Sequence, residues 1–245
     1  MNLPFFFNEH IVDHAELLLD EDNSRHIVSV LRMEAGEEMH LTNGKGVLAT
    51  AVIAEPHKKK CRVTITGIER FPPAARRTAI GISLLKNPVR FEWFLEKAAE
   101  LGIAEIFPLL CARTEKQHFR QQRMQNVLVS ALLQSRQTWM PVLYEPMTLE
   151  KSWTHFEAYQ QRFIAHCETD PNKRDLMQEL LAGAALPLVL IGPEGDFSPA
   201  EITSAIERRY KPVSLGTTRL RTETAGITAA VLLQLGGVAK KSSKS

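Results

Sequence analysis

Two glycine-bearing segments near the C-terminus have residue types that can bind a ligand. The first is the loop Gly192–Phe197, which follows the apolar run Leu188–Ile191 and precedes a helix start signal. That signal is a serine for the cap, a proline for the first helical position and a glutamate that completes a capping box, at Ser198, Pro199 and Glu201. Ligands of open α/β sheets bind where a strand ends and a helix begins, and glycine lets them approach the backbone closely.

The second segment repeats this order of strand, loop and helix. The expected strand Val213–Leu215 leads into the polar loop Gly216–Thr224, and an expected helix of small residues runs from Ala225 to Leu235. Small residues such as Gly226 allow that helix to pack closely against other backbone. If the two strands lie side by side, their loops meet at one edge of the sheet and form one cleft.

Charged side chains in these loops are the candidates for chemistry. Arg221 can stabilise negative charge that develops on a substrate, and Glu194 or Glu223 can accept a proton. Each feature also has a structural explanation. A Gly-Pro-Glu-Gly run is often only a turn, a surface arginine is often solvated or ion-paired, and a glutamate near a helix start can interact with the helix dipole alone.

Motifs for other chemistries are absent from the sequence. It contains no GxGxxG, GxxxxGK[ST] or GxSxG pattern, so dinucleotide, P-loop and hydrolase functions lack support. His10 and His14 are four residues apart, but no HExxH pattern includes them, and the cysteines at 61, 111 and 167 form no CxxC pair. We therefore expect no metal site and no disulfide framework.

The elements that must position the loops change in kind near residue 72. Residues 1–72 are expected to form a small β-barrel, with strands at 3–7, 38–42, 47–54 and 62–68 and one helix near 24–33. The segment Phe71–Arg77 contains two prolines and is the expected linker. Residues 73–245 alternate strands (79–85, 103–110, 162–166, 186–191) with helices (about 91–101, 124–132 and 173–181), which predicts a parallel sheet with helices on both faces.

The composition is that of an ordinary globular protein. Of 245 residues, 44% are hydrophobic and 24% charged, and the formal net charge is +2, so any surface for RNA must be a local patch. No run approaches the ~20 apolar residues of a membrane helix, and the first residues lack a basic region before their short apolar run. We expect a cytoplasmic protein without a membrane segment.

Together these segments resemble a known family. Ile191–Glu201 and Leu215–Ala225 resemble the paired signatures of the RsmE family, which are SPOUT-class methyltransferases that methylate N3 of a uridine in 16S rRNA of the small ribosomal subunit. The similarity extends to His26–Arg32, Glu96–Gly102 and Gln134-Ser135, so it covers nearly the whole chain.

The resemblance implies an α/β fold and a cofactor. It implies a PUA-like, RNA-binding β-barrel at residues 1–72, and at residues 73–245 a SPOUT domain whose mostly parallel sheet carries a trefoil knot, a topology otherwise almost absent from proteins. It also implies a homodimer that binds S-adenosylmethionine in a bent shape inside the knot. The cofactor contacts implied for this chain are Ile191, Gly192, Gly195, Leu215, Gly216, Leu220, Thr222 and Ala225.

The implied substrate is small-subunit rRNA, either free or in the assembled 30S subunit. Its phosphates are expected to contact basic residues of both domains: Arg25, Arg32, Lys58, Lys59, Lys60, Arg113 and Arg136. Uracil N3 must lose a proton, and Arg221 is the expected stabiliser of the resulting charge, with Glu194 or Glu223 as proton acceptor. The alternatives are a SPOUT methyltransferase for another base or ribose, a catalytically inactive RNA-binding relative, and an α/β enzyme with a different adenosine-containing ligand.

The chain departs from the family pattern at three places. Asp196 stands where the family usually has a second glycine, and an aspartate fits there if its backbone has an ordinary dihedral angle. Arg136-Gln137 replaces the usual Gly-Arg after Gln134-Ser135. The segment Lys86–Arg90 lacks the usual glycine and acidic residue.

Overall fold

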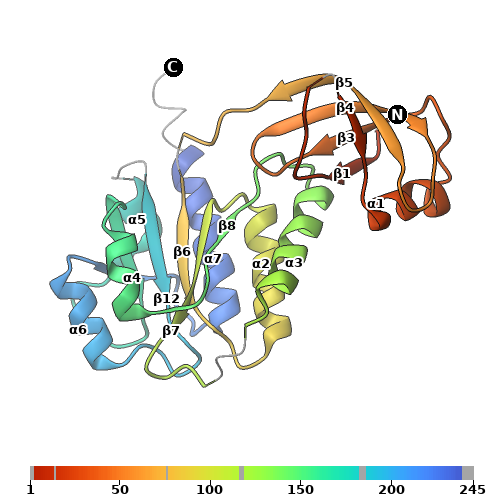
Figure 1. Ribbon diagram of the computed structural model, residues 1–245. Helices are drawn as coiled ribbons and strands as arrows, with labels where there is room; N and C mark the ends of the chain where they lie inside the picture. The colour runs from red at the N-terminus through yellow and green to blue at the C-terminus, as the bar shows by residue number, and fades with distance from the viewer. Residues whose placement is uncertain (1–2, 14, 76, 116–118, 182–185, 239–245) are drawn as a thin grey trace, which may run out of the picture. The chain divides into compact units, whose positions relative to one another are not determined.

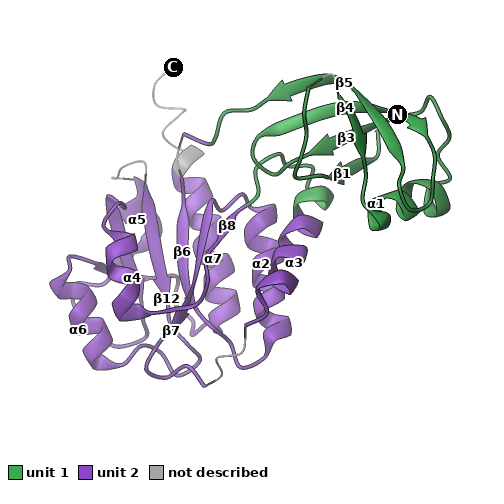
Figure 2. Ribbon diagram, in the orientation of Figure 1, with its two compact units in different colours: residues 1–73, 132–140 green, residues 74–131, 141–245 purple. Residues whose placement is uncertain are grey.

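The structure is a computed structural model that describes residues 3–13, 15–75, 77–115, 119–181 and 186–238 (Figure 1). It has two compact units, coloured separately in Figure 2. Unit 1 comprises residues 1–73 with 132–140, and unit 2 comprises residues 74–131 with 141–245. Residues 132–140 thus belong to unit 1, although they follow the expected linker in the sequence. The assignment of functional domains to 1–72 and 73–245 remains a prediction.

Unit 1 is built on a five-stranded sheet in the order β1-β3-β4-β5-β2. The strands are β1 (Phe5–Phe7), β2 (Glu16–Leu18), β3 (Glu38–Thr42), β4 (Val47–Glu55) and β5 (Arg62–Arg70). β1 pairs with β3 in parallel, and the other pairs are antiparallel. Alternate residues of β4 are buried, as a half-buried strand requires, and register shifts after Thr50 and Ile53 bend its pairing with β5.

The expected helix near 24–33 is wrong in its bounds and its type. The α-helix α1 spans Glu21–Arg25, and a π-helical turn, η1, continues it over His26–Val30. The helix begins earlier because the Asp20 carboxylate caps it by accepting a hydrogen bond from the Asn23 N–H at 2.8 Å. The π-helical turn ends at Val30, two residues before Arg32, whose left-handed φ of 56° cannot continue a right-handed helix.

The segment 132–140 lies against the β3–β4 hairpin of unit 1. Gly46 N–H donates to the Thr138 carbonyl at 2.8 Å, and Met140 N–H donates to the Gly44 carbonyl at 2.9 Å. The indole N–H of Trp139 donates to the Phe71 carbonyl at 3.1 Å. Gly46 must be glycine here, because its φ is 85° and a Cβ would lie 2.6 Å from the Trp139 ring.

Unit 2 is an α/β domain with an eight-stranded sheet, and the expected parallel sheet is confirmed. The strand order is β11-β13-β10-β12-β6-β7-β8, and β9 also pairs with β7. Every pairing among the described residues of this sheet is parallel. The strands are β6 (Ala79–Ser83), β7 (Glu105–Leu110), β8 (Val142–Leu143), β9 (Met147–Thr148), β10 (Gln161–Ala165), β11 (Arg174–Asp175), β12 (Pro187–Ile191) and β13 (Lys211–Ser214).

Helices cover both faces of this sheet (Figure 1). They are α2 (Pro88–Glu100), α3 (Gln121–Gln134), α4 (Leu149–Phe156), α5 (Leu176–Leu181), α6 (Pro199–Glu207) and α7 (Thr222–Val238). Burial explains this arrangement, because the residues of β6 and β12 are buried on both faces of the sheet. The helix expected at 173–181 begins later, at Leu176, because Arg174 and Asp175 pair with β13 instead.

The last strand and the last helix return the chain to the middle of the sheet. β13 lies outside β10, two strands away from β12, yet α7 packs against β6, β12, α2 and α5. The chain between β13 and α7 therefore crosses the ends of β10 and β12. A hydrophobic core of this unit, to which α4 and α6 contribute, includes the fully buried side chains of Phe107, Phe156 and Phe197.

Candidate functional site

Three neighbouring parallel strands end at the same level. Ala165 at the end of β10 pairs with Ile191 of β12 on one side and with Val213 of β13 on the other. The loops that follow these strands therefore emerge side by side at the carboxyl edge of the sheet. The sequence predicted two of the three loops. It missed the segment 166–173, although this segment also follows a strand and precedes a helix.

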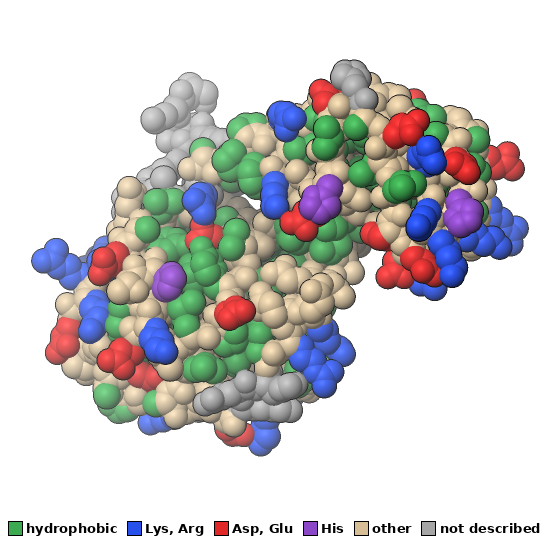
Figure 3. Space-filling model, viewed as in Figure 1, with side chains coloured by type: hydrophobic (Ala, Val, Ile, Leu, Met, Phe, Trp, Pro, Cys, Tyr) green, Lys and Arg blue, Asp and Glu red, His purple; other side chains and the backbone are tan. Residues whose placement is uncertain are grey.

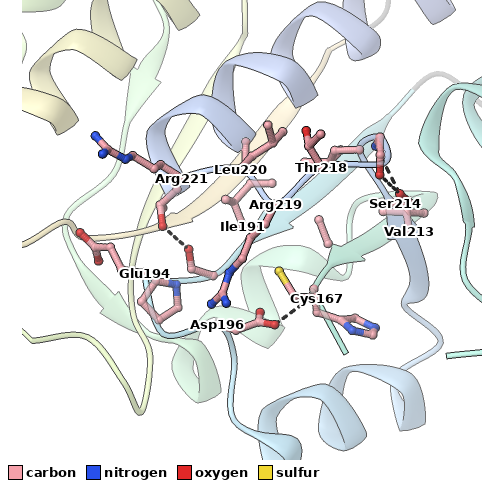
Figure 4. A pocket seen from close by; sticks show the side chains of 18 of the residues that line it. Cys167, Ile191, Glu194, Asp196, Val213, Ser214, Thr218, Arg219, Leu220 and Arg221 are labelled. Carbon is pink, nitrogen blue, oxygen red and sulfur yellow. Dashed lines mark hydrogen bonds between the residues drawn. The ribbon is translucent and has the colours of Figure 1, made fainter. Parts of the chain in front are cut away.

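A cavity of about 720 Å³ lies where the three loops meet (Figure 4). Its volume is within the range of about 300–1,000 Å³ that is typical of small-molecule sites. Its lining residues come from all three loops and the start of α7: Ala165, His166, Cys167, Lys173, Ile191, Gly192, Pro193, Glu194, Asp196, Val213, Ser214, Leu215, Gly216, Thr217, Thr218, Arg219, Leu220, Arg221, Thr222 and Ala225.

Most of the expected cofactor and catalytic residues line this cavity. Those that do are Ile191, Gly192, Glu194, Leu215, Gly216, Leu220, Arg221, Thr222 and Ala225. Gly195 and Glu223 are outside its lining. Glu223 is only 5% exposed; its Oε1 is 3.7 Å from Arg90 Nε, and its Oε2 has no hydrogen-bond partner in the described structure.

Local packing determines the course of the loop after β12. A Cβ on Gly192 would lie 3.0 Å from the Phe197 backbone nitrogen, so a side chain there would require the adjacent turn to shift. The buried Thr222 hydroxyl donates to the Gly192 carbonyl at 3.0 Å and so joins this loop to the start of α7. The expected capping box is confirmed, with Ser198 and Glu201 each bonding the other's backbone N–H at the start of α6.

Asp196 does not meet the condition of an ordinary backbone dihedral angle under which an aspartate was expected to fit. Its φ is 65°, in the left-handed region where glycine is usual. Its short carboxylate compensates through local hydrogen bonds: Oδ1 accepts from Phe197 N at 2.8 Å and Oδ2 accepts from Cys167 N at 2.7 Å. Asp196 therefore ties the loop after β12 to the segment after β10, and both sides of this bond line the cavity (Figure 4).

Arg113, an expected phosphate contact, is engaged within unit 2. Its Nη1 donates to the Gly195 carbonyl at 2.7 Å and to the Phe197 carbonyl at 3.3 Å. Next to it, Ala112 N–H donates to Glu201 Oε1 at 2.8 Å. These bonds hold the loop Gly192–Phe197 in place, a role that the sequence did not indicate because it depends on contacts between distant segments.

The remaining expected RNA contacts lie in unit 1. Lys58, Lys59 and Lys60 form an exposed turn between β4 and β5. This turn lies beside α1, because Cys61 N–H donates to the Ser24 hydroxyl at 2.9 Å, and α1 carries the exposed Arg25. Arg32 and Arg136 have left-handed φ values of 56° and 53°, and Arg136 donates to the Leu3 carbonyl at 3.3 Å. Figure 3 shows Lys and Arg side chains gathered at the end of unit 1 that carries α1.

The segment after β10 brings a buried imidazole to the cavity. His166 is 8% exposed, and neither ring nitrogen has a hydrogen-bond partner in the described structure. Burial lowers the pKa of His166, and the nearby charge of Lys173 lowers it further, so the neutral imidazole is favoured. The adjacent Cys167 is exposed, whereas Cys61 and Cys111 are buried, and burial raises the pKa of the Cys111 thiol to about 12.

Among the described residues, no helix has the length and apolar character needed to span a membrane. The same residues contain no group of three or more His, Cys, Asp or Glu side chains arranged to hold a metal ion.

Known proteins resemble this chain over most of its length. The RNA methyltransferase domain model matches residues 72–234, and the RNA methyltransferase PUA domain model matches residues 19–66. "Ribosomal RNA small subunit methyltransferase E" of Mycobacterium bovis is 28% identical over 234 residues, which is 91% of this chain and 87% of the relative.

Two solved structures have the same fold. A "probable rRNA-methyltransferase" of Porphyromonas gingivalis is 33% identical, with a TM-score of 0.87 over 97% of this chain and 100% of that one. A protein of Legionella pneumophila, solved in complex with the bound cofactor SAM, is 28% identical, with a TM-score of 0.84 over 96% of this chain and 98% of that one. These matches confirm the resemblance to the RsmE family and the expected fold class. This chain belongs to the family of RNA methyltransferases, with a PUA domain before the methyltransferase domain.

Proposed function

We propose that this protein transfers a methyl group from S-adenosylmethionine to N3 of one uridine in 16S rRNA of the small ribosomal subunit. The observation that carries the proposal is the cavity formed by three adjacent loops at the carboxyl edge of the parallel sheet, with Arg221 in its lining. Membership of the RNA methyltransferase family supports the reaction class. The names of the relatives support the small-subunit rRNA as substrate, and the Legionella pneumophila structure supports the cofactor.

The lining of the cavity fits this cofactor. Ile191, Leu215 and Leu220 supply apolar surface for an adenine ring, and Gly192 and Gly216 leave their backbone groups accessible. With Thr222 and Ala225 these are the residues that we propose to hold the cofactor, and Gly195 contributes through the shape of its loop. The bound cofactor supplies the electrophilic methyl group. The protein's contribution is to hold the target nitrogen in line with it.

Arg221 and Glu194 are the proposed catalytic groups. Both are exposed side chains that line the cavity, and Figure 4 shows them at the same end of it. Arg221 would stabilise the negative charge on uracil when N3 loses its proton, and Glu194 would accept that proton. Glu223, the other candidate base, lies outside the lining beside Arg90. We therefore propose Glu194 as the base and a supporting role for Glu223.

The proposed RNA surface uses both units. The turn Lys58–Lys60 and Arg25 form a basic group on the PUA-like unit, joined by the bond between Cys61 and Ser24. Arg32, Arg113 and Arg136 are proposed as further phosphate contacts. The target base must leave its stack to reach the cavity in unit 2.

We also propose that the active form is a cytoplasmic homodimer. Exposed apolar side chains lie on α2 and α7, where Val89 is 61%, Trp93 45% and Leu235 50% exposed. Large exposed apolar residues on packed helices favour coverage by another chain. Light scattering of the purified protein tests this, with Trp93→Glu as the variant expected to give monomers.

The first experiment is transfer of labelled methyl from S-adenosylmethionine to small subunits that lack their own modification, followed by nucleoside analysis. N3-methyluridine at one site is the expected product. Arg221→Ala should lower the rate by about 100-fold or more, whereas Arg208→Ala changes the C-cap residue that follows α6, outside the cavity lining, and serves as the control. Methyl on another base or on ribose would identify one alternative. Absence of both cofactor binding and transfer would indicate an inactive RNA-binding relative.

A further inference from the structure

Two opposite charges are fixed to one short stretch of backbone at the cavity. The Lys173 ammonium donates to the His166 carbonyl at 2.9 Å and also to the Glu168 carbonyl. The Asp196 carboxylate accepts from the Cys167 N–H between them, at 2.7 Å. Lys173 and Asp196 both line the cavity, so three consecutive residues hold a positive and a negative group at its wall.

These two charges do not neutralise each other directly. No ion pair joins Lys173 and Asp196 among those of the described residues, and the two groups move the pKa of the nearby His166 in opposite directions. The Lys173 ammonium and the Asp196 carboxylate can each form further hydrogen bonds. An ammonium has three donors, of which Lys173 uses two, and each carboxylate oxygen of Asp196 accepts one backbone bond and has a further lone pair.

A ligand group that carries both charges would complete this arrangement. An α-amino acid has an α-carboxylate and an α-ammonium on one carbon, and charge-assisted hydrogen bonds to both would be strong. We propose that Lys173 binds the α-carboxylate and Asp196 binds the α-ammonium of the amino-acid end of the cofactor. This rests on the proposed function, and it leaves the apolar wall at Ile191, Leu215 and Leu220 for the adenosine end.

The test compares two ligands by calorimetry. S-Adenosylmethionine has the amino-acid end, whereas 5′-methylthioadenosine keeps the adenosine and the sulfur but lacks that end. Lys173→Met and Asp196→Asn should each weaken S-adenosylmethionine about tenfold or more and change 5′-methylthioadenosine less than about twofold. Lys151→Met, on α4 outside the cavity lining, is the matched control and should change neither. Equal weakening of both ligands, or no weakening, would overturn the proposal.

A second measurement uses the unaltered protein, so it does not depend on the folding of a variant. Cys167 is exposed and lines the cavity, whereas the other two cysteines are buried. S-Adenosylmethionine at saturation should protect Cys167 from alkylation by iodoacetamide, and 5′-methylthioadenosine at equal occupancy should protect it much less. Equal protection by both ligands would refute the proposed binding of the amino-acid end by Lys173 and Asp196, but not the binding of the cofactor in this cavity. Binding of neither ligand refutes the cofactor assignment as well.

Discussion

A single hydroxyl joins the two loops that the sequence singled out. Thr222 Oγ1 donates to the Gly192 carbonyl at 3.0 Å, and Thr222 is 4% exposed. Thr222→Val keeps the branched shape of the side chain, so the variant creates no cavity. It removes the donor, however, and leaves the Gly192 carbonyl without this bond in a buried setting.

Loss of this hydrogen bond should lower the free energy of unfolding. A buried polar group deprived of its partner costs about 1–3 kcal/mol. In a protein of this size each kcal/mol lowers the melting temperature by about 2–4 °C, so Thr222→Val should melt about 2–12 °C lower. Affinity for S-adenosylmethionine should also fall, because the bond sets the distance between two walls of the cavity.

Thr228→Val is the matched control on the same helix. The Thr228 hydroxyl donates to the Thr224 carbonyl one turn earlier, at 2.9 Å, in an exposed position. Its removal should change stability by no more than about 0.5 kcal/mol. Urea unfolding and calorimetric cofactor binding are measured for both variants. If the two variants lose the same stability and bind the cofactor equally well, the hydroxyl of Thr222 does not join the loops as argued.

Other changes have equally definite expectations. Gly226→Ala should lower the urea midpoint, because a Cβ there would be 2.7 Å from the Phe94 ring; the overpacking cost of about 1–3 kcal/mol exceeds the gain of about 1 kcal/mol in helix propensity. Arg136→Gly should raise the melting temperature by about 2–4 °C through relief of its left-handed backbone, whereas Asp196→Gly should not raise it. Burial lowers the pKa of His166 in the folded state, so protonation of this imidazole destabilises the fold. The contribution of His166 to the free energy of unfolding is therefore present above the pKa of the unfolded state, about 6.5, and decreases as the pH falls below that value. His166→Gln should therefore flatten the stability profile between about pH 7.5 and 5.5, and an unchanged slope would contradict this.

Local signals in the sequence predicted the elements well where short-range chemistry determines them. The strand Glu38–Thr42 was predicted with its observed bounds, because its ends are defined by a glycine before it and an Asn-Gly turn after it. The capping box at Ser198 was also predicted correctly, since its bonds span only three residues. Two of the three loops of the candidate site were found in this way.

Long-range contacts determine the features that the sequence did not indicate. The strand order β13-β10-β12 places the segment 166–173 beside the other two loops. The sequence pattern within that segment does not predict which strands and loops lie next to it. The same limit applies to Arg113, whose bonds to the Gly195 and Phe197 carbonyls join residues more than eighty positions apart. The charge of Arg113 predicted a contact with RNA, and the structure adds a second role for this side chain, which is to hold the loop beside the cavity.

Asp196 and Arg136 both have a left-handed backbone, and they indicate why the family pattern has glycine at their positions. Both occupy positions where the family usually has glycine, and both have positive φ, 65° and 53°. The glycine in the pattern therefore indicates the backbone conformation and not only space for a ligand.

The side chains of Asp196 and Arg136 compensate unequally for their left-handed backbones. Asp196 accepts two backbone N–H bonds, whereas Arg136 is exposed and donates one bond at 3.3 Å. Glycine at 196 would relieve about 1–2 kcal/mol of strain but lose two charge-assisted bonds of about 1.5–3 kcal/mol each before solvent screening. At 136 the relief outweighs the loss. The aspartate is therefore compatible with the fold because its carboxylate bonds to the backbone of the cavity wall.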